Sequence, residues 1–417
     1  MSTRRDAAWQ ARANRAGGRT TLSLDDEIDA LLAADVTTEP VPTDPGTAAG
    51  TATGTTAETD LPEGFHRLVV TGVDRLCDDA VAVTFDVPDD LREHYAFRPG
   101  QYLTLRRTTP GGAQPEERRS YSICAPAGAA PRVGVRRVDG GLFSSWLVDE
   151  VTTGDVVEVG PPSGSFTPDL AAGTHHGLIA AGSGITPVLS IASSLLAGHD
   201  DTRVTLVYGN RRTDTVMFTE EIADLKDRYG PRLHLLHVLS REPTEAEIFN
   251  GRLDEGKLQA LLGGLVDVGG VDDWWLCGPL GMTDAASSVL AGLGVEKRRV
   301  HRELFYVDEP PPELHREDDV PAGDGTGSEV TLVLNGRTTT LSLPRDRPLL
   351  DSAQEVRGDV PFACKGGVCG TCRARVVDGE VDMRRNFALE DDEVDAGFVL
   401  TCQTRPVSDA VTVDFDS

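Results

Sequence analysis

A chain of 417 residues in which 39% are hydrophobic is long enough for roughly two to four domains with ordinary globular cores. The formal net charge of −27 argues against nucleic acid as a partner, because phosphates would be repelled, and suits either a generally acidic surface or steering toward a basic protein. No apolar run approaches the roughly 20 residues of a membrane span, so no membrane partner is expected.

Residues 1–60 are expected to form a disordered N-terminal extension. The stretch from Thr43 to Asp60 consists mainly of Thr, Ala, Gly and Pro, which bury too little apolar surface to fold. A short amphipathic helix is expected near Ser23, with Ile28 and Leu31 on one face. No export signal is apparent, and the odd cysteine count of seven favours free thiols in a reducing cytoplasm.

Residues 61–168 are predicted to form an antiparallel β-barrel, because short β segments alternate with turn residues at the spacing typical of that fold. The motif Arg119-Ser-Tyr-Ser122 places a cation and an aromatic ring on one face of a strand, with Ser122 on the other face. Gly140 and Gly141 then open an amphipathic helix that could seat a phosphate. The predicted strands are His66–Val73, Ala80–Val87, Gln101–Arg106, Arg119–Cys124 and Arg132–Val138.

Residues 169–307 alternate strand and helix patterns, which predicts a parallel α/β sheet. The Gly-rich turn from Gly182 to Pro187 joins a buried strand to a helix, with Thr186 as the expected cap and Pro187 as its first residue. Such a turn can cradle a pyrophosphate on backbone amides. Pro187 replaces the third glycine of the dinucleotide fingerprint, so a tight structural turn is the alternative interpretation.

Two further features of this domain concern the choice and position of the nicotinamide cofactor. Arg211 and Arg212 follow the second strand, where NAD sites usually have a carboxylate and where arginine suits a 2′-phosphate. They favour NADPH over NADH, with exposed surface arginines as the alternative. Cys277 lies at the carboxyl end of a predicted strand, where open α/β sheets bind ligands, although a cysteine there can also be merely buried.

Residues 308–328 are rich in Pro, Glu, Asp and Gly and are predicted to be an acidic linker. Residues 329–417 are predicted to be a small α+β domain of the β-grasp type, opening with a hairpin whose Asn335-Gly336 turn is of type I′. Its other expected elements are helices near Leu349–Val356 and Leu389–Ala396, and strands Ala374–Val377 and Val411–Phe415.

The most specific motif of the chain is a set of four cysteines in this last domain, at the spacing of a plant-type [2Fe–2S] cluster. Each iron of such a cluster takes two bridging sulfides and two cysteine sulfurs, so three thiolates on one loop are joined by a fourth from elsewhere. Glycines in the loop are expected to adopt positive φ and to donate amides to sulfur. A zinc site would normally have two C-x-x-C pairs, and a disulfide framework suits short secreted chains. The cysteines are Cys364, Cys369, Cys372 and Cys402, and the glycines are Gly366, Gly367 and Gly370.

With these motifs in order, the chain resembles the ferredoxin–NADP reductase superfamily fused to a C-terminal plant-type ferredoxin. Within it, the chain is similar to the reductase subunits of bacterial phenylacetyl-CoA epoxidases. The resemblance runs from about residue 65 to residue 416. It is carried by Arg98-Pro-Gly-Gln101, Arg119-Ser-Tyr-Ser122, Ala181-Gly-Ser-Gly-Ile-Thr-Pro187, Tyr208-Gly-Asn-Arg211, Cys277-Gly-Pro279, Glu303-Leu-Phe305, the cysteine loop and the ending Val411-Thr-Val-Asp-Phe-Asp416.

The resemblance implies a role for each motif. Tyr121 would pack against the isoalloxazine ring, Ser122 would bond the flavin near N5, and Cys277 would lie by the nicotinamide ring, which makes these three the catalytic residues. The cysteine set would hold the metal cluster. The other implied cofactor-binding residues are Arg98, Arg119, Gly141 and Ser144 for the flavin and its phosphates, Phe305 at the flavin border, and Gly182, Gly184, Thr186, Arg211, Arg212, Gly278 and Pro279 for the nicotinamide dinucleotide.

The domain order implies an electron relay. A nicotinamide gives up two electrons together as hydride and a [2Fe–2S] cluster accepts one at a time, so a flavin between them can serve both. The resemblance implies FAD rather than FMN, NADPH as donor, and as acceptor a di-iron oxygenase that epoxidises phenylacetyl-CoA in phenylacetate catabolism. Two alternatives stay open: the reductase of another aromatic-ring oxygenase or monooxygenase, and a non-catalytic carrier that uses the cluster domain only for docking.

Overall fold

The structure of the protein is a computed structural model that describes residues 61, 64–108, 116–170, 174–306, 327–357 and 360–417. All of them belong to one compact unit. The expected disordered extension 1–60, with its helix near Ser23, lies outside the described residues, as does almost all of the expected linker 308–328. No helix among the described residues is long and apolar enough to cross a membrane.

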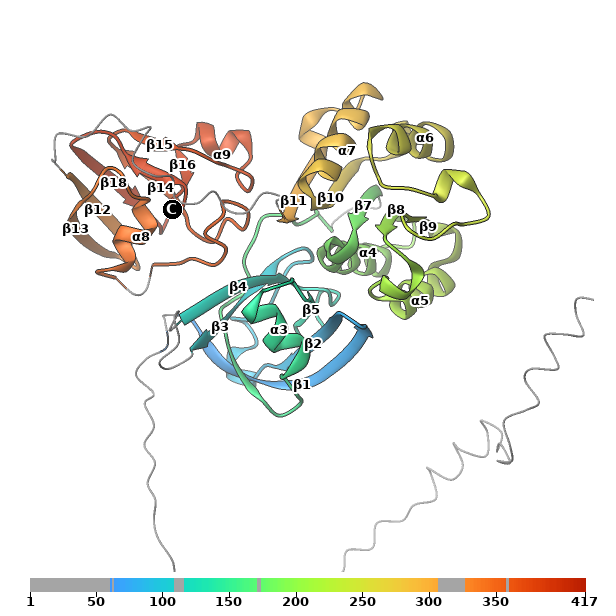
Figure 1. Ribbon diagram of the computed structural model, residues 1–417, viewed down its shortest axis with the longest axis horizontal. Helices are drawn as coiled ribbons and strands as arrows, with labels where there is room; N and C mark the ends of the chain where they lie inside the picture. The colour runs from blue at the N-terminus through green and yellow to red at the C-terminus, as the bar shows by residue number, and fades with distance from the viewer. Residues whose placement is uncertain (1–60, 62–63, 109–115, 171–173, 307–326, 358–359) are drawn as a thin grey trace, which may run out of the picture. The chain divides into compact units, whose positions relative to one another are not determined.

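The first domain is a six-stranded antiparallel sheet in the order β4-β3-β6-β1-β2-β5. It closes into a barrel where Ile123, just after β4, bridges to Val133 of β5. Helix α3 (Leu142–Asp149) packs onto this domain (Figure 1). The strands are β1 His66–Cys77, β2 Ala80–Asp86, β3 Tyr102–Thr108, β4 Glu116–Ser122, β5 Arg132–Arg136 and β6 Val156–Val159. The five predicted strands are present, and only the four-residue β6 was not predicted.

Strand β2 explains how the barrel is joined to the next domain. Its residues are buried on both faces, so it does not alternate between apolar and polar side chains. Val81, Val83 and Phe85 point into the barrel core. Ala80 and Ala82 point the other way and share a second core with the α/β domain. The two domains therefore share one continuous apolar cluster.

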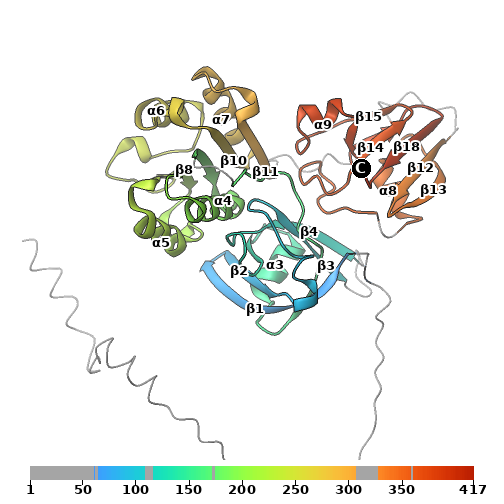
Figure 2. The ribbon, with the colours of Figure 1, turned by 180° about the vertical axis from the view of Figure 1, so that it is seen from behind.

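The α/β domain is a five-stranded parallel sheet in the order β11-β10-β7-β8-β9. Helices α4 and α5 cover one face and α6 and α7 the other (Figures 1 and 2), and each face has its own apolar cluster. The predicted class is therefore confirmed. The strands are β7 His175–Ala181, β8 Arg203–Asn210, β9 Leu233–Leu239, β10 Asp273–Pro279 and β11 Val300–Tyr306, and the helices are α4 Ile185–Gly198, α5 Thr219–Tyr229, α6 Glu255–Leu265 and α7 Leu280–Gly292.

The start of α4 differs from the prediction. A 3₁₀ turn over Gly182–Gly184 leads directly into the helix at Ile185. Thr186 is therefore not the cap but the second helical residue, and its hydroxyl donates to the Ser183 carbonyl at 3.0 Å. Pro187 is the third residue rather than the first. A proline is tolerated there because the first four amides of a helix have no intrahelical partner.

The C-terminal domain is a mixed five-stranded sheet in the order β13-β12-β18-β14-β16, in which only β12 and β18 are parallel. Asn335 and Gly336 have φ of 56° and 66°, which confirms the predicted type I′ turn. The elements are β12 Ser328–Leu334, β13 Arg337–Leu343, α8 Leu349–Gln354, β14 Arg373–Asp378, β15 Val381–Met383, α9 Asp391–Asp395, β16 Phe398–Leu400, β17 Thr404–Pro406 and β18 Ala410–Asp414. The three-residue strands β15, β16 and β17 were not predicted, because so short a segment shows no alternation.

Candidate functional site

Strand β4 presents the residues expected to hold the flavin. Tyr121 is partly buried against the barrel core, and its ring centroid lies 6.0 Å from that of Phe143 in α3. The Arg119 side chain is 45% exposed, its guanidinium lies 3.6 Å from the Glu117 carboxylate, and its Nη1 donates to the Arg118 carbonyl at 2.7 Å. Ser122 is buried. The strand therefore separates an outward cation from a buried hydroxyl, as its alternation predicts.

The loop before β3 carries Arg98 to the surface. The side chain of Gln101 accepts the Arg98 amide at 2.8 Å and closes the turn. Gly100 has a φ of 92°, and a Cβ there would lie 1.9 Å from the Phe166 carbonyl oxygen. Only glycine fits this approach. The Arg98 side chain is exposed, which leaves it available to a ligand without showing what it binds.

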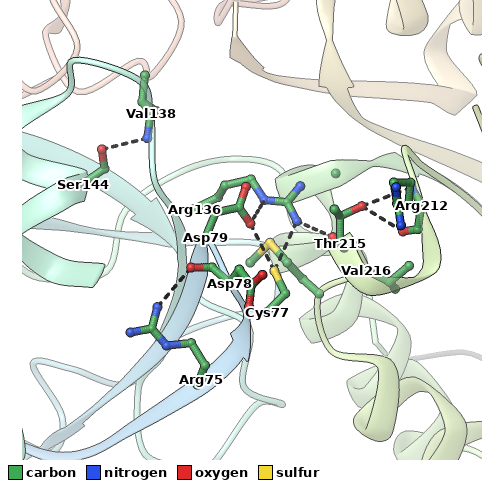
Figure 3. A network of polar contacts seen from close by, with 12 residues as sticks. Arg75, Cys77, Asp78, Asp79, Arg136, Val138, Ser144, Arg212, Thr215 and Val216 are labelled. Atoms are coloured by element: carbon green, nitrogen blue, oxygen red, sulfur yellow. Dashed lines mark hydrogen bonds and ion pairs between the residues drawn. The ribbon is translucent and has the colours of Figure 1, made fainter. Parts of the chain in front are cut away.

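The N-terminus of α3 has the form of a phosphate seat. The Val138 amide donates to the Ser144 hydroxyl oxygen at 3.1 Å (Figure 3). Gly141 caps the helix, and the Ser144 hydroxyl donates to the Gly141 carbonyl at 3.3 Å. A Cβ on Gly141 would lie 2.8 Å from the Ser144 oxygen. Glycine at this position therefore lets the Ser144 hydroxyl close the cap, and the first amides of the helix have no intrahelical partner.

The glycine turn of the α/β domain is pressed against the end of β10. A Cβ on Gly184 would lie 2.2 Å from the carbonyl oxygen of Cys277. Gly182 has a φ of 55°, the left-handed region that favours glycine. The turn and Cys277 thus form one contact at the carboxyl edge of the sheet, the edge at which the resemblance places the nicotinamide dinucleotide. Gly278 and Pro279 end β10 at this edge, and Phe305 lies near the end of β11.

Glu303 joins the two predicted ring sites, and sequence reasoning did not single it out. Its carboxyl oxygen Oε2 accepts from the Ser122 hydroxyl at 3.3 Å and from the Cys277 thiol at 3.9 Å. Cys277 and Glu303 are register partners on the parallel strands β10 and β11. The available signal was an acidic residue in the otherwise apolar stretch Glu303-Leu-Phe305, but only the fold brings it to Ser122.

Burial sets the protonation states of Glu303 and Cys277. It raises the pKa of the Glu303 carboxyl to about 8, so the carboxyl is largely protonated at neutral pH. Burial, together with the nearby Glu303, raises the pKa of the Cys277 thiol well above its usual range. A neutral thiol is a poor nucleophile. Cys277 can therefore pack and donate weakly beside a ring, but it is unsuited to covalent catalysis.

Arg136 is a second residue that sequence reasoning missed. It ends β5 of the barrel, yet its Nη2 donates to the Thr215 carbonyl in the loop after β8, and its Nε lies 3.2 Å from Asp79 (Figure 3). Its Nη1 would lie 3.3 Å from a Cβ on Gly182. The barrel thus supplies a cation to the entrance of the glycine turn, where a dinucleotide's phosphates would approach.

The two arginines that follow β8 differ in their surroundings. Both are exposed. Arg212 is paired with Asp214, with distances of 3.2 Å from Nε and 3.1 Å from Nη2 to the two carboxylate oxygens. Arg211 lies beside the end of β9, where its carbonyl accepts from the Arg241 amide at 2.8 Å. Arg211 is therefore the better placed of the two predicted residues to meet an added negative charge.

The four cysteines of the C-terminal motif are brought together as two pairs. The Cys369 thiol hydrogen-bonds Cys364 and lowers the pKa of Cys364, and Cys372 hydrogen-bonds Cys402 and lowers the pKa of Cys402 in the same way. Among the described residues, no three His, Cys, Asp or Glu side chains converge on a single metal ion. Two thiol pairs suit a binuclear cluster, in which each iron takes two cysteine sulfurs.

The loop around these thiols confirms part of what its glycines predicted. Gly367 and Gly370 have φ of 78° and 67°. Gly366 does not have positive φ, and that expectation was wrong: Lys365 adopts the left-handed conformation instead, with φ of 53°. The Gly366 amide donates to the Cys364 sulfur at 3.3 Å, and the Gly367 amide donates to Cys402. Amides aimed at sulfur favour the thiolate form that an iron requires.

Three family descriptions match successive parts of the chain. "Oxidoreductase FAD-binding domain" matches residues 67–167, "Oxidoreductase NAD-binding domain" matches residues 178–288, and "2Fe-2S iron-sulfur cluster binding domain" matches residues 332–407. The last range contains all four motif cysteines. The flavin, nicotinamide and iron–sulfur assignments made from the sequence are therefore confirmed at the level of the domains.

Two similar proteins are aligned over nearly their whole length. A subunit of 1,2-phenylacetyl-CoA epoxidase from Escherichia coli (strain K12) is 40% identical over 357 residues, 85% of this chain and 98% of that protein. The ferredoxin reductase component of 3-ketosteroid-9-alpha-monooxygenase from Rhodococcus rhodochrous is 35% identical over 368 residues, 85% of this chain and 99% of that protein.

Among solved structures, phthalate dioxygenase reductase has the same fold. Its TM-score is 0.52 at 24% identity, over 84% of this chain and 98% of that one. The fold, the three matching domains and the two full-length relatives agree. The chain belongs to the ferredoxin–NADP reductase superfamily, as an iron–sulfur flavin oxidoreductase with a C-terminal [2Fe–2S] domain, the group to which the 1,2-phenylacetyl-CoA epoxidase component also belongs.

Proposed function

We propose that the protein is an NADPH-dependent reductase that passes electrons through FAD and a [2Fe–2S] cluster to a di-iron oxygenase. The observation that supports this most directly is the meeting of Ser122, Cys277 and Glu303. It joins the barrel strand expected to hold the flavin ring to the sheet edge expected to hold the nicotinamide. Hydride transfer requires those two rings to lie within contact distance, so a shared group of side chains is the arrangement that the reaction needs.

The residues present fit each cofactor. Tyr121 and Ser122 would hold the flavin ring, with Phe305 at its border. The phosphates of FAD would lie over the N-terminus of α3 at Gly141 and Ser144, with Arg98 and Arg119 as cationic partners. The nicotinamide dinucleotide would follow the turn at Gly182, Gly184 and Thr186 toward Cys277, Gly278 and Pro279. The two thiol pairs Cys364–Cys369 and Cys372–Cys402 would each take one iron.

When bound, the flavin supplies the ability to accept a hydride and to release its two electrons one at a time. It is needed because a nicotinamide donates two electrons together and a cluster accepts only one. The protein's own residues position and insulate these groups. The buried Ser122 hydroxyl donates to Glu303, and the protonated Glu303 carboxyl would provide a hydrogen-bond donor where the two rings would meet. The neutral Cys277 thiol fills the floor of the nicotinamide site without reacting.

The relatives support an oxygenase as the acceptor. Proteins 40% and 35% identical to this chain are components of an epoxidase and of a monooxygenase, so an oxygenase is the acceptor that both support. The higher identity favours a di-iron epoxidase acting on phenylacetyl-CoA. The seven cysteines are all free thiols, which supports a reducing cytoplasm as the compartment.

Stopped-flow spectroscopy of the purified protein tests the relay. NADPH is expected to bleach the flavin first and then the cluster, and a di-iron oxygenase with phenylacetyl-CoA is expected to reoxidise both. A cluster that stays oxidised while the flavin is bleached would contradict the relay. Reoxidation by a Rieske-type steroid or aromatic oxygenase but not by the di-iron oxygenase would keep the relay and replace the acceptor.

A further inference from the structure

The tyrosine paired with Ser122 in the flavin barrel also contacts the cysteine loop. Tyr102 lies opposite Ser122 in the antiparallel ladder between β3 and β4, and its side chain is buried. Its hydroxyl lies 3.0 Å from Oγ1 of Thr371. Thr371 stands between Gly370 and Cys372. The contact therefore joins the strand next to the flavin site to the loop that would hold the cluster.

The hydrogen bonds of this contact have a defined direction. The Thr371 hydroxyl also faces the sulfur of Cys369 as a hydrogen-bond partner, and a sulfur bound to iron carries no proton and can only accept, so Thr371 is the donor to sulfur. A hydroxyl has a single hydrogen, so Thr371 must then accept from Tyr102. Burial raises the pKa of the Tyr102 phenol well above its usual range, so the phenol keeps its proton. Both hydrogen bonds point from the barrel toward the cluster sulfur.

Other contacts surround this bridge. Arg118 of β4 is 2% exposed, and its guanidinium lies 5.2 Å from the ring centroid of Phe65 and 4.5 Å from that of Phe362. Phe362 lies just before the cysteine loop. Ser120 adds a hydroxyl 3.5 Å from that of Thr371. A guanidinium enclosed between two aromatic rings gains cation–π attraction at low solvent exposure, so the barrel edge and the cysteine loop meet in a packed contact.

We propose that the Tyr102–Thr371 bridge positions the cluster to receive electrons from the flavin, with Thr371 as the residue that links the barrel to the cluster ligand Cys369. This rests on the proposed function. In each transfer, reduced flavin at Ser122 is oxidised by one electron and the oxidised cluster is reduced by one, and no bond is made or broken. The protein contributes a short buried path: Ser122, the strand ladder, Tyr102, Thr371 and Cys369.

The bridge has a second consequence, independent of turnover. A hydrogen bond donated to a cluster sulfur stabilises the more negative, reduced cluster and so raises its midpoint potential. Removing the Thr371 hydroxyl should therefore make the potential more negative. Removing only the Tyr102 hydroxyl should change the potential less, because Thr371 still donates to Cys369.

The test uses the fully loaded protein with the substitutions Thr371→Ala, Thr371→Ser and Tyr102→Phe. After flavin reduction by NADPH, the rate of cluster reduction is expected to fall about tenfold in Thr371→Ala and in Tyr102→Phe, the effect of losing roughly one hydrogen bond from the docked arrangement. Thr371→Ser keeps the hydroxyl and should restore the rate. An EPR-monitored titration with chemical reductants should give a more negative midpoint for Thr371→Ala and an almost unchanged one for Thr371→Ser.

A matched control is Tyr95→Phe. Tyr95 is another buried tyrosine of the barrel, but its hydroxyl donates to the Val159 carbonyl at 2.6 Å, so its loss should leave cluster reduction unchanged. A Thr371→Ala protein with wild-type cluster reduction and an unshifted midpoint would overturn the proposal. If wild-type cluster is never reduced through the flavin, the proposed function fails instead, and the chemical titration still decides whether Thr371 acts on the cluster.

Discussion

The carboxyl group of Glu303 shows how a single residue takes its chemistry from the fold. It is held by a hydroxyl from one domain and a thiol from its own, and burial raises its pKa to about 8. At neutral pH it is therefore mostly a hydrogen-bond donor rather than an anion. At the proposed junction of the flavin and nicotinamide rings, a neutral donor would avoid placing a fixed negative charge where hydride and electrons pass.

This setting predicts how stability depends on pH. The pKa of Glu303 lies near 8 in the fold against an ordinary value of 4.5, so folding favours the protonated form. That contribution is complete below pH 4.5 and is lost as pH rises toward 8. Between pH 5 and 8, the free energy of unfolding of the wild type should fall by about 2 kcal/mol relative to Glu303→Gln, less than the full shift implies because the side chain is partly exposed.

Urea unfolding of the two proteins at both pH values measures this difference. Glu303→Gln keeps the shape and the hydrogen bonds of the side chain but cannot titrate. If the difference in free energy of unfolding between the two proteins is the same at pH 5 and pH 8, Glu303 is already ionised in the folded protein and cannot act as a hydrogen-bond donor.

Arg211 and Arg212 support a prediction about the preference for NADPH over NADH. Arg211→Ala is expected to lower kcat/KM for NADPH about tenfold while changing that for NADH little, because a charge-assisted bond to the 2′-phosphate would be lost. Arg212→Ala is the internal comparison, since Arg212 is already paired with Asp214 and should have the smaller effect. Steady-state kinetics with both nucleotides give the ratio. If kcat/KM falls equally with NADPH and NADH, Arg211 does not bind the 2′-phosphate.

At the scale of elements, the sequence predicted what is decided locally. The Asn335-Gly336 turn was predictable because its two positive φ angles select those residue types. The start of α4 was not, because Gly182–Gly184 can either cap a helix or form the turn before it. That choice follows from how Gly184 packs on Cys277, 93 positions away along the chain. Glu303 and Arg136 were missed for a similar reason: each has one of its partners, Ser122 and Thr215 respectively, on another domain.

The glycine turn therefore supports a prediction about packing. Gly184→Ala would place a methyl group 2.2 Å from the Cys277 carbonyl oxygen, so β10 and the turn must move apart at a cost of about 3 kcal/mol, an overpacking effect. Nucleotide affinity should fall with it, because the turn forms the proposed pyrophosphate seat. Denaturant unfolding and NADPH titration measure the two effects.

The matched control lies at the other end of the same helix. Gly198 ends α4, and a Cβ there would meet nothing within 4 Å. Gly198→Ala should be neutral or stabilise the protein by up to about 1 kcal/mol, because alanine restricts the unfolded chain. A Gly184→Ala protein as stable as Gly198→Ala would mean that the turn is not packed against β10.

At the scale of the whole molecule, the cluster domain has an apolar core separate from that of the flavin and nicotinamide domains. One cluster spans the barrel and the α/β domain, so the flavin and nicotinamide sites share their packing. The C-terminal domain has a core of its own, which includes Cys372 and Cys402. Damage to the cluster should therefore stay within the C-terminal domain and leave the first redox step to proceed.

Cys372→Ser tests that separation. Cys372 is 2% exposed, and serine is a poor ligand for the iron, so the cluster and all electron transfer beyond the flavin should be lost. The rate of flavin reduction by NADPH should stay within about twofold of wild type, because no contact of Cys372 reaches the shared core. Cys77→Ser is the control, since Cys77 lies outside the motif and its thiol donates to Asp79 at 3.1 Å, a bond that serine can replace. If flavin reduction fails together with the cluster in Cys372→Ser but not in Cys77→Ser, the C-terminal domain supports the nucleotide site, and the three cofactors work as one inseparable unit.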